Sequence, residues 1–123
     1  MSENPRPRVL LADDHAEILA ALRRMLVPYC DVVGQVRNGR TLLEAAGTLQ
    51  PDVIVVDVNM PGVSGLEACR AIKQATPSIR VVMLTASDDA ALRRRAFELG
   101  ASAFVVKYQI ADELVPAILD PPT

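Results

Sequence analysis

Short apolar runs alternate with segments of helical periodicity along the whole chain, and this alternation constrains the fold more than any other feature. The runs are too short for helices and rich in β-branched side chains, which is typical of strands buried on both faces. The strand candidates are Val9–Ala12, Asp31–Val36, Val53–Val56, Val81–Leu84 and Ala103–Val106. Each run is followed by apolar side chains at helical spacing, which predicts five helices.

The helical segments also carry local start and stop signals. Ser64 and Glu67 have the spacing of a capping box, and Gly100 follows the fourth apolar stripe as a C-terminal cap. Strict alternation of strands and helices in 123 residues predicts one α/β domain. We expect a flavodoxin-like (CheY-like) doubly wound sheet of five parallel strands in the order 2-1-3-4-5, with five helices.

Polar side chains stand at the ends of four of the predicted strands. Asp13 and Asp14 follow the first, Asp57 the third, Thr85 the fourth and Lys107 the fifth. The carboxyl ends of parallel strands share one edge of the sheet, so residues far apart in sequence should converge there. The sequence therefore predicts a cluster of three carboxylates, one hydroxyl and one ammonium group.

The charges of this cluster restrict its chemistry. Three neighbouring carboxylates repel one another, so their pKa values rise unless a cation joins them. Oxygen ligands favour a hard ion, and Mg²⁺ is the usual choice where phosphate also binds. Lys107 and Thr85 are suited to hold phosphoryl oxygens, while Asp57 has the chemistry of a nucleophile. Together these groups favour formation of an aspartyl phosphate.

Simpler interpretations exist for each residue alone, and two other functions share parts of the pattern. A single Asp after a strand often caps a helix, and Lys107 alone could be a solvated charge. A phosphohydrolase with an aspartyl-phosphate intermediate would carry a general acid two residues after Asp57, where this chain has Asn59. A flavodoxin-like cofactor binder would need a phosphate cradle after the first strand, but the acidic loop there repels phosphate.

Composition excludes several broad classes. Half of the residues are hydrophobic, which argues against disorder, and the net charge of −2 gives no reason to expect nucleic-acid binding. No apolar run approaches the roughly 20 residues that span a bilayer, and the N-terminus has no signal region, so a cytoplasmic location is expected. Cys30 and Cys69 match no metal-ligand spacing and are interpreted as reduced core thiols.

Four segments together resemble the receiver domain of two-component response regulators. They are Leu10–His15, Asp57–Gly65, Leu84–Ala86 and Gly100–Lys107. The Asp-Asp-His opening and the absence of Pro after Lys107 resemble the LuxR/NarL-type receivers in particular. The resemblance covers residues 8–119, which leaves an N-terminal tail (1–7) and the start of a linker or C-terminal tail (120–123).

The resemblance implies a role for each acidic residue. Asp57 would accept a phosphoryl group from a histidine kinase. Asp14 and Asp57 would bind Mg²⁺ (or Mn²⁺) through their side chains and Asn59 through its backbone carbonyl, while Asp13 would act through a metal-bound water. The protein would then be no enzyme, apart from self-catalysed phosphoryl transfer to Asp57 and autodephosphorylation.

The resemblance also implies how the signal would be read out. Lys107 would pair with the phosphoryl group, and Thr85 would hydrogen-bond to it. Phe104 occupies the position of the family's switch aromatic, which turns inward as Thr85 moves, and the output would be the surface of helix 4, strand 5 and helix 5. Phe104 lacks a hydroxyl, so such a switch would act through packing. Tyr108 stands where many receivers have a Pro after a cis bond.

Partners and neighbours of the segment follow from the same resemblance. A transcriptional regulator with a C-terminal DNA-binding output domain is expected, with a standalone receiver or phosphorelay protein as the alternative. A phosphorylation-dependent homodimer is a further expectation, although Pro116 falls inside the last predicted helix and should shorten or kink it. His15 is expected near the first turn of helix 1, facing solvent, and Arg93–Arg95 on a solvated face of helix 4.

Overall fold

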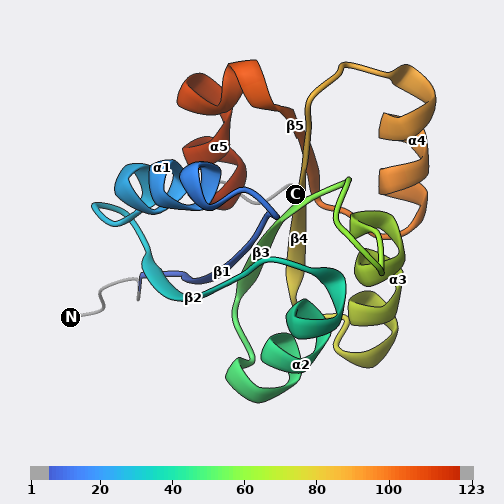
Figure 1. Cartoon of the computed structure of the whole chain (residues 1–123), viewed down its shortest axis with the longest axis horizontal. Helices are drawn as coiled ribbons and strands as arrows, with labels where there is room; N and C mark the ends of the chain where they lie inside the picture. Colours follow the sequence, from blue (N-terminus) through green and yellow to red (C-terminus); the bar gives the residue numbers. More distant parts are fainter. Residues whose placement is uncertain (1–5, 120–123) are drawn as a thin grey trace.

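The computed structural model describes residues 6–119, which form a five-stranded parallel sheet in the order β2-β1-β3-β4-β5 (Figure 1). The strands are β1 (Arg8–Ala12), β2 (Asp31–Val36), β3 (Val53–Asp57), β4 (Arg80–Thr85) and β5 (Ala103–Val106). The helices are α1 (Ala16–Leu26), α2 (Gly39–Leu49), α3 (Gly65–Ala75), α4 (Ala90–Glu98) and α5 (Ile110–Leu119), with a 3₁₀ turn η1 (Lys107–Gln109) before α5. The predicted fold class and strand order are confirmed.

Helices cover both faces of the sheet, as the apolar character of the strands requires. Alternate side chains of each strand point to opposite faces, so Leu10 and Ile54 pack in one core with α2, α3 and α4, while Leu11 and Val55 pack in another with α1 and α5. Figure 1 shows the two groups of helices on opposite sides of the sheet. All five residues of β3 are buried, which places this strand at the centre of the molecule.

The predicted capping residues form their expected contacts at the helix ends. The Ser64 side chain accepts a hydrogen bond from the Glu67 backbone N–H at 3.2 Å, and the Glu67 carboxylate accepts one from the Ser64 N–H at 3.1 Å. Gly100 follows α4 with a φ of +108°, a conformation that glycine adopts without strain. These contacts begin α3 and end α4 where the sequence predicts.

The strands differ from prediction only at their polar ends. β1 and β4 begin at Arg8 and Arg80, and β3 and β4 end at Asp57 and Thr85, because these residues continue the ladder although they lie outside the apolar runs. Hydrophobic pattern locates the buried part of a strand but not the hydrogen-bonded residues that flank it.

Helix α5 contains Pro116, as predicted, and begins two residues before Asp112. Pro116 has no N–H to donate to the carbonyl of Asp112. The Lys107–Tyr108 peptide bond is trans, like every peptide bond within residues 6–119. Cys30 and Cys69 are free thiols buried in the two cores, as expected.

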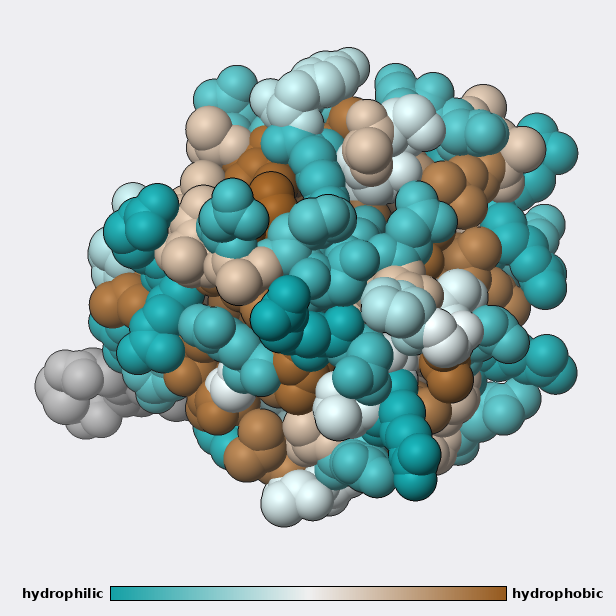
Figure 2. All heavy atoms as spheres, in the orientation of Figure 1, coloured by the Kyte–Doolittle hydropathy of each residue, from teal (hydrophilic) through white to brown (hydrophobic). Residues whose placement is uncertain are grey.

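The surface seen in Figure 2 is mainly hydrophilic, with hydrophobic residues in small separate areas. None of the helices in residues 6–119 has the length and apolar character to cross a membrane. The expected linker at 120–123 and residues 1–5 of the expected N-terminal tail lie outside the described residues.

Candidate functional site

The carboxyl ends of β1 and β3 bring the predicted acidic residues together. Asp13 and Asp14 directly follow β1, and Asp57 is the last residue of β3. Asp13, Asp14, His15 and Asp57 each offer one ligand atom, and these four atoms lie within 4.8 Å of one another. The predicted convergence of three carboxylates is therefore present, with an imidazole added.

Lys107 lies between two of these carboxylates. Its Nζ is 3.0 Å from Asp13 Oδ2 and 3.5 Å from Asp57 Oδ1. It starts η1 immediately after β5, so the strand aims its side chain at the same edge of the sheet. The sequence places Lys107 at this edge but gives no sign that Asp13 is its closer partner.

The surroundings of Asp57 disfavour its charged form. The residue is only 3% exposed, and this burial is the main reason that its pKa is raised above the ordinary value of 3.8. The charge of Lys107 lowers the pKa, whereas that of Asp13 raises it. A hydrogen bond from the Asn59 backbone also lowers it. An added cation would relieve this unfavourable balance.

The loop after β3 is held close to Asp57 by a glycine. A Cβ on Gly65 would overlap the carbonyl oxygen of Asp57, and the Gly65 N–H donates a hydrogen bond to the Val58 carbonyl at 2.9 Å. Gly62 has a φ of +76°, which lets the Pro61–Gly62 turn reverse the chain before α3. Small residues here fix the backbone that supports the carboxylate.

Thr85 and Phe104 occupy buried positions on β4 and β5. The Thr85 hydroxyl donates a hydrogen bond to the Ser87 carbonyl at 3.1 Å and accepts one from the Ser87 N–H at 3.3 Å. Phe104 is 4% exposed, so its ring already points inward. The Arg93 guanidinium lies over this ring, 5.0 Å from its centroid. Arg93, Arg94 and Arg95 are all exposed, as the sequence predicts, and the contact of Arg93 with Phe104 is an additional one that the pattern does not indicate.

Sequence reasoning missed two more contacts at the site. His15 is the N-cap of α1 and its side chain is 61% exposed, as predicted, but its Nδ1 also lies beside Asp13 and Asp14. Arg37 donates a hydrogen bond from Nη2 to the Asp14 carbonyl at 3.0 Å. The contact of His15 could have been expected because His15 follows the acidic pair directly in the sequence. The contact of Arg37 could not, because it depends on the geometry of the β2–α2 loop.

The donor set fits a hard divalent cation. Among the described residues, Asp13 Oδ2 and Asp14 Oδ1 are buried atoms that accept no hydrogen bond, although Lys107 and His15 nitrogens lie near them. Carboxylate oxygens with free lone pairs are the ligands that Mg²⁺ and Mn²⁺ prefer. The residues present therefore suit the ion that the sequence predicts.

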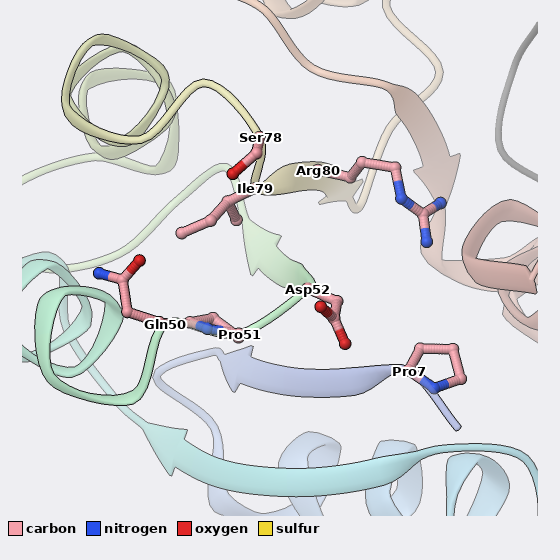
Figure 3. Close-up of a pocket in the computed structure, with 7 residues that line it drawn as sticks. All are labelled: Pro7, Gln50, Pro51, Asp52, Ser78, Ile79 and Arg80. Atoms are coloured by element: carbon pink, nitrogen blue, oxygen red, sulfur yellow. The ribbon is translucent and has the colours of Figure 1, made fainter. Parts of the chain in front are cut away.

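A second hollow, of about 480 Å³, lies at the opposite, amino-terminal edge of the sheet (Figure 3). It is lined by Pro7, Gln50, Pro51, Asp52, Ser78, Ile79 and Arg80. Both of its charged side chains make structural hydrogen bonds: Asp52 accepts one from the Arg8 N–H, and Arg80 Nη2 donates one to the Ile118 carbonyl, while Arg80 Nη1 is buried without a hydrogen-bond partner. Figure 3 shows the Arg80 guanidinium directed away from Asp52, so the two do not form a joint site.

Curated relatives of the chain are response regulators and transcriptional regulators. The response regulator GacA of Pseudomonas aeruginosa is 37% identical over 113 residues, which are 90% of this chain and 53% of that protein. UvrY of Escherichia coli is 35% identical over 112 residues, covering 89% of this chain and 51% of that protein. The chain thus spans about half the length of the curated relatives it matches.

Solved structures give the same result. The signal receiver domain of a NarL response regulator from Mycobacterium tuberculosis superimposes with a TM-score of 0.90 at 31% identity, covering 95% of this chain and 96% of that one. The response regulator domain of Thermotoga maritima CheB superimposes with a TM-score of 0.85 at 34% identity, covering 91% of this chain and 92% of that one. The family model for the response regulator receiver domain matches residues 9–119. The chain belongs to the receiver domain family of two-component response regulators.

Proposed function

We propose that Asp57 accepts a phosphoryl group from a histidine kinase and that this modification switches the domain between signalling states. The observation that carries the proposal is the position of Asp57, a buried carboxylate within 4.8 Å of two others and 3.5 Å from the Lys107 ammonium. Such a site is unfavourable for an isolated carboxylate but well suited to a nucleophile that works beside cations.

The transfer step uses the chain's own residues in distinct roles. A carboxylate oxygen of Asp57 forms the new bond to phosphorus while the bond from phosphorus to the donor nitrogen breaks, and the donor imidazole keeps that electron pair. The Lys107 ammonium stands close enough to stabilise the phosphoryl oxygens, and the Thr85 hydroxyl can rotate from the Ser87 carbonyl towards them. Autodephosphorylation would be the attack of water on the same phosphorus, in which the bond from phosphorus to the Asp57 oxygen breaks, the carboxylate is restored and inorganic phosphate leaves.

Mg²⁺, or Mn²⁺, would be held by the side chains of Asp14 and Asp57 and by the Asn59 backbone carbonyl, with Asp13 acting through a water. The bound ion supplies positive charge that offsets the repulsion between the carboxylates and the incoming phosphoryl group. Two observations support this assignment: the free lone pairs of the buried acids and the raised pKa of Asp57.

The signal would leave the site through β4 and β5. Movement of Thr85 towards the phosphoryl group would break its hydrogen bonds with Ser87 and reshape the β4–α4 loop. Phe104 and Arg93 join β5 to α4, and a groove of about 470 Å³ between α4, β5 and α5 lies beside them. We expect the α4–β5–α5 surface to be the output, with a switch that acts through packing because Phe104 has no hydroxyl.

The wider context is proposed from the relatives. Full-length relatives named as transcriptional regulators make a C-terminal DNA-binding output domain the expected neighbour, in a protein that works in the cytoplasm. The receiver segment itself carries a net charge of −2 and is not expected to bind nucleic acid. Pro116 makes α5 a poor candidate for the sole contact of a homodimer.

Intact-mass measurement tests the central step. Metal-free protein is incubated with acetyl phosphate, with and without Mg²⁺, and we expect one added phosphoryl group only when Mg²⁺ is present. Hydroxylamine should remove it, because it cleaves acyl phosphates. Asp57→Asn should stay unmodified, whereas the exposed Asp88→Asn serves as a matched control and should be labelled like the wild type.

Two results would contradict the proposal. Full labelling of Asp57→Asn would place the modification elsewhere. Steady hydrolysis of a phosphomonoester at enzyme-like rates would favour the phosphohydrolase alternative, which the presence of Asn59 in place of a second Asp argues against.

A further inference from the structure

His15 lies closer to the acidic cluster than its position at the start of a helix requires. Its backbone is extended (φ −103°, ψ 115°), and its side chain makes no hydrogen bond to the first turn of α1. The side chain is also 61% exposed, so burial does not fix its direction. Instead, Nδ1 lies 3.1 Å from Asp13 Oδ1 and 3.0 Å from Asp14 Oδ1. The carboxylates therefore account for the orientation of the ring.

One of these spacings matches the arrangement of ligands around an ion. Adjacent ligands of an octahedral cation with bonds of about 2.1 Å stand about 3.0 Å apart, since the edge of an octahedron is about 1.4 times its bond length. The 3.0 Å between His15 Nδ1 and Asp14 Oδ1 agrees with that edge, and ligand atoms of His15, Asp14 and Asp57 all lie within 4.8 Å of one another, whereas the 3.1 Å contact with Asp13 is a hydrogen-bond distance. His15 Nδ1 is therefore positioned to bind an ion that is held by the Asp14 oxygen.

Metal coordination would fix the tautomer of the ring. A cation binds an imidazole nitrogen that carries no proton, so coordination through Nδ1 requires the ring proton to be on Nε2.

We propose that His15 is a nitrogen ligand of the divalent-cation site and makes this site favour nitrogen-preferring ions such as Ni²⁺ and Zn²⁺ over Mg²⁺. This inference rests on the proposed metal site at Asp14 and Asp57. Imidazole suits Ni²⁺ and Zn²⁺, whereas carboxylate and water suit Mg²⁺. The domain would therefore bind Ni²⁺ with one more strong ligand than it uses for Mg²⁺.

Calorimetric titration of the untagged full chain with each metal alone tests the ligand set. We expect His15→Ala to weaken Ni²⁺ binding by about tenfold or more while Mg²⁺ affinity stays within about twofold. Glu17→Gln is the matched control, since Glu17 lines the same hollow as His15 and should leave both affinities unchanged. His15→Gln, which keeps a polar side chain without the imidazole, should behave like His15→Ala.

Nuclear magnetic resonance provides a direct readout that a structural role would not change. His15 is the only histidine of the chain, so its ring nitrogens can be assigned without ambiguity. Added Zn²⁺ should shift the Nδ1 resonance to the range of a coordinated nitrogen and leave Nε2 protonated. Mg²⁺ should produce a much smaller change.

The outcomes separate this inference from the proposed function. Unchanged Ni²⁺ affinity in His15→Ala, an equal loss for both ions, or an uncoordinated Nδ1 in Zn²⁺ would overturn the role of His15. Tighter Mg²⁺ binding without a Ni²⁺ effect would show that the imidazole only competes with the metal. If Mg²⁺-dependent labelling of Asp57 persists in those cases, the proposed function stands and only the His15 ligand is lost.

Discussion

Replacing Asp57 with Asn should make the metal-free domain more stable at neutral pH, although it removes the proposed phosphoacceptor. Asp57 is buried, and its pKa is raised chiefly by that burial. The folded state therefore holds its ionised form less favourably than water does. Asn has nearly the same shape and can still accept the Asn59 backbone hydrogen bond, but it carries no charge.

The size of the effect follows from the neighbouring charges. With an effective dielectric constant of about 20, a carboxylate such as Asp13 at the outer limit of 4.8 Å repels Asp57 by about 3.5 kcal/mol. Lys107 at 3.5 Å attracts it by about 5 kcal/mol. These two opposing terms are of similar size, so the desolvation of the buried carboxylate, which is the largest cause of its raised pKa, decides the sign. We expect Asp57→Asn to increase the free energy of unfolding of the metal-free domain by about 1–3 kcal/mol.

The gain should depend on pH in a defined direction. A carboxyl group with a raised pKa binds its proton more tightly in the folded state, so lowering the pH favours folding relative to unfolding. The destabilisation by Asp57 is complete above its folded pKa, declines as the pH falls, and vanishes below the ordinary value of 3.8. The difference between Asp57→Asn and the wild type should shrink in the same window.

Urea unfolding followed by circular dichroism measures this difference, since the chain has no Trp to report by fluorescence. Asp88→Asn is the control, because Asp88 is exposed and its loss should change the free energy of unfolding by less than about 0.5 kcal/mol. A less stable Asp57→Asn protein at pH 7 without metal, or a gain that persists unchanged at pH 4, would refute the reasoning.

Three further expectations follow. Mg²⁺ at ten times its Kd should raise the wild-type free energy of unfolding by about 1.4 kcal/mol in the same urea assay, and Asp14→Asn should lose most of this gain. Gly65→Ala should cost about 2 kcal/mol or more because its Cβ overlaps the Asp57 carbonyl, whereas Gly47→Ala, with open space in α2, should stabilise by about 0.5–1 kcal/mol. Burial raises the pKa of Cys69 to about 11, so this thiol should resist a disulfide reagent at pH 8 until urea is added.

The fold and the outline of the site could be predicted because both depend on regular patterns. Buried parallel strands are continuous apolar runs, and their carboxyl ends share an edge, so the positions of Asp13, Asp57 and Lys107 followed from counting strand ends. The capping box at Ser64 likewise depends only on local spacing. These features need no knowledge of side-chain directions.

Other features could not be predicted because they depend on how side chains compete for partners. Lys107 lies nearer to Asp13 than to Asp57, His15 turns to two carboxylates, and Arg93 covers Phe104. Each contact joins residues on different elements or depends on a rotamer, and helical periodicity says only which face of an element a residue occupies. The extra residues at the ends of β1, β3 and β4 have a related cause, since backbone hydrogen bonding extends beyond the apolar run.

The sharing of Lys107 between Asp13 and Asp57 connects the stability of the site to its proposed signal. One ammonium group partly balances two buried carboxylates, so extra negative charge on Asp57 would draw that cation away from Asp13. Asp13 would then need positive charge from a bound metal ion, which would couple the proposed phosphorylation to metal binding. Lys107 begins η1, which leads directly into α5, and Phe104 precedes it on β5 beneath Arg93 of α4. A shift of Lys107 towards a phosphoryl group would therefore act on the same strand that contacts both helices of the proposed output surface.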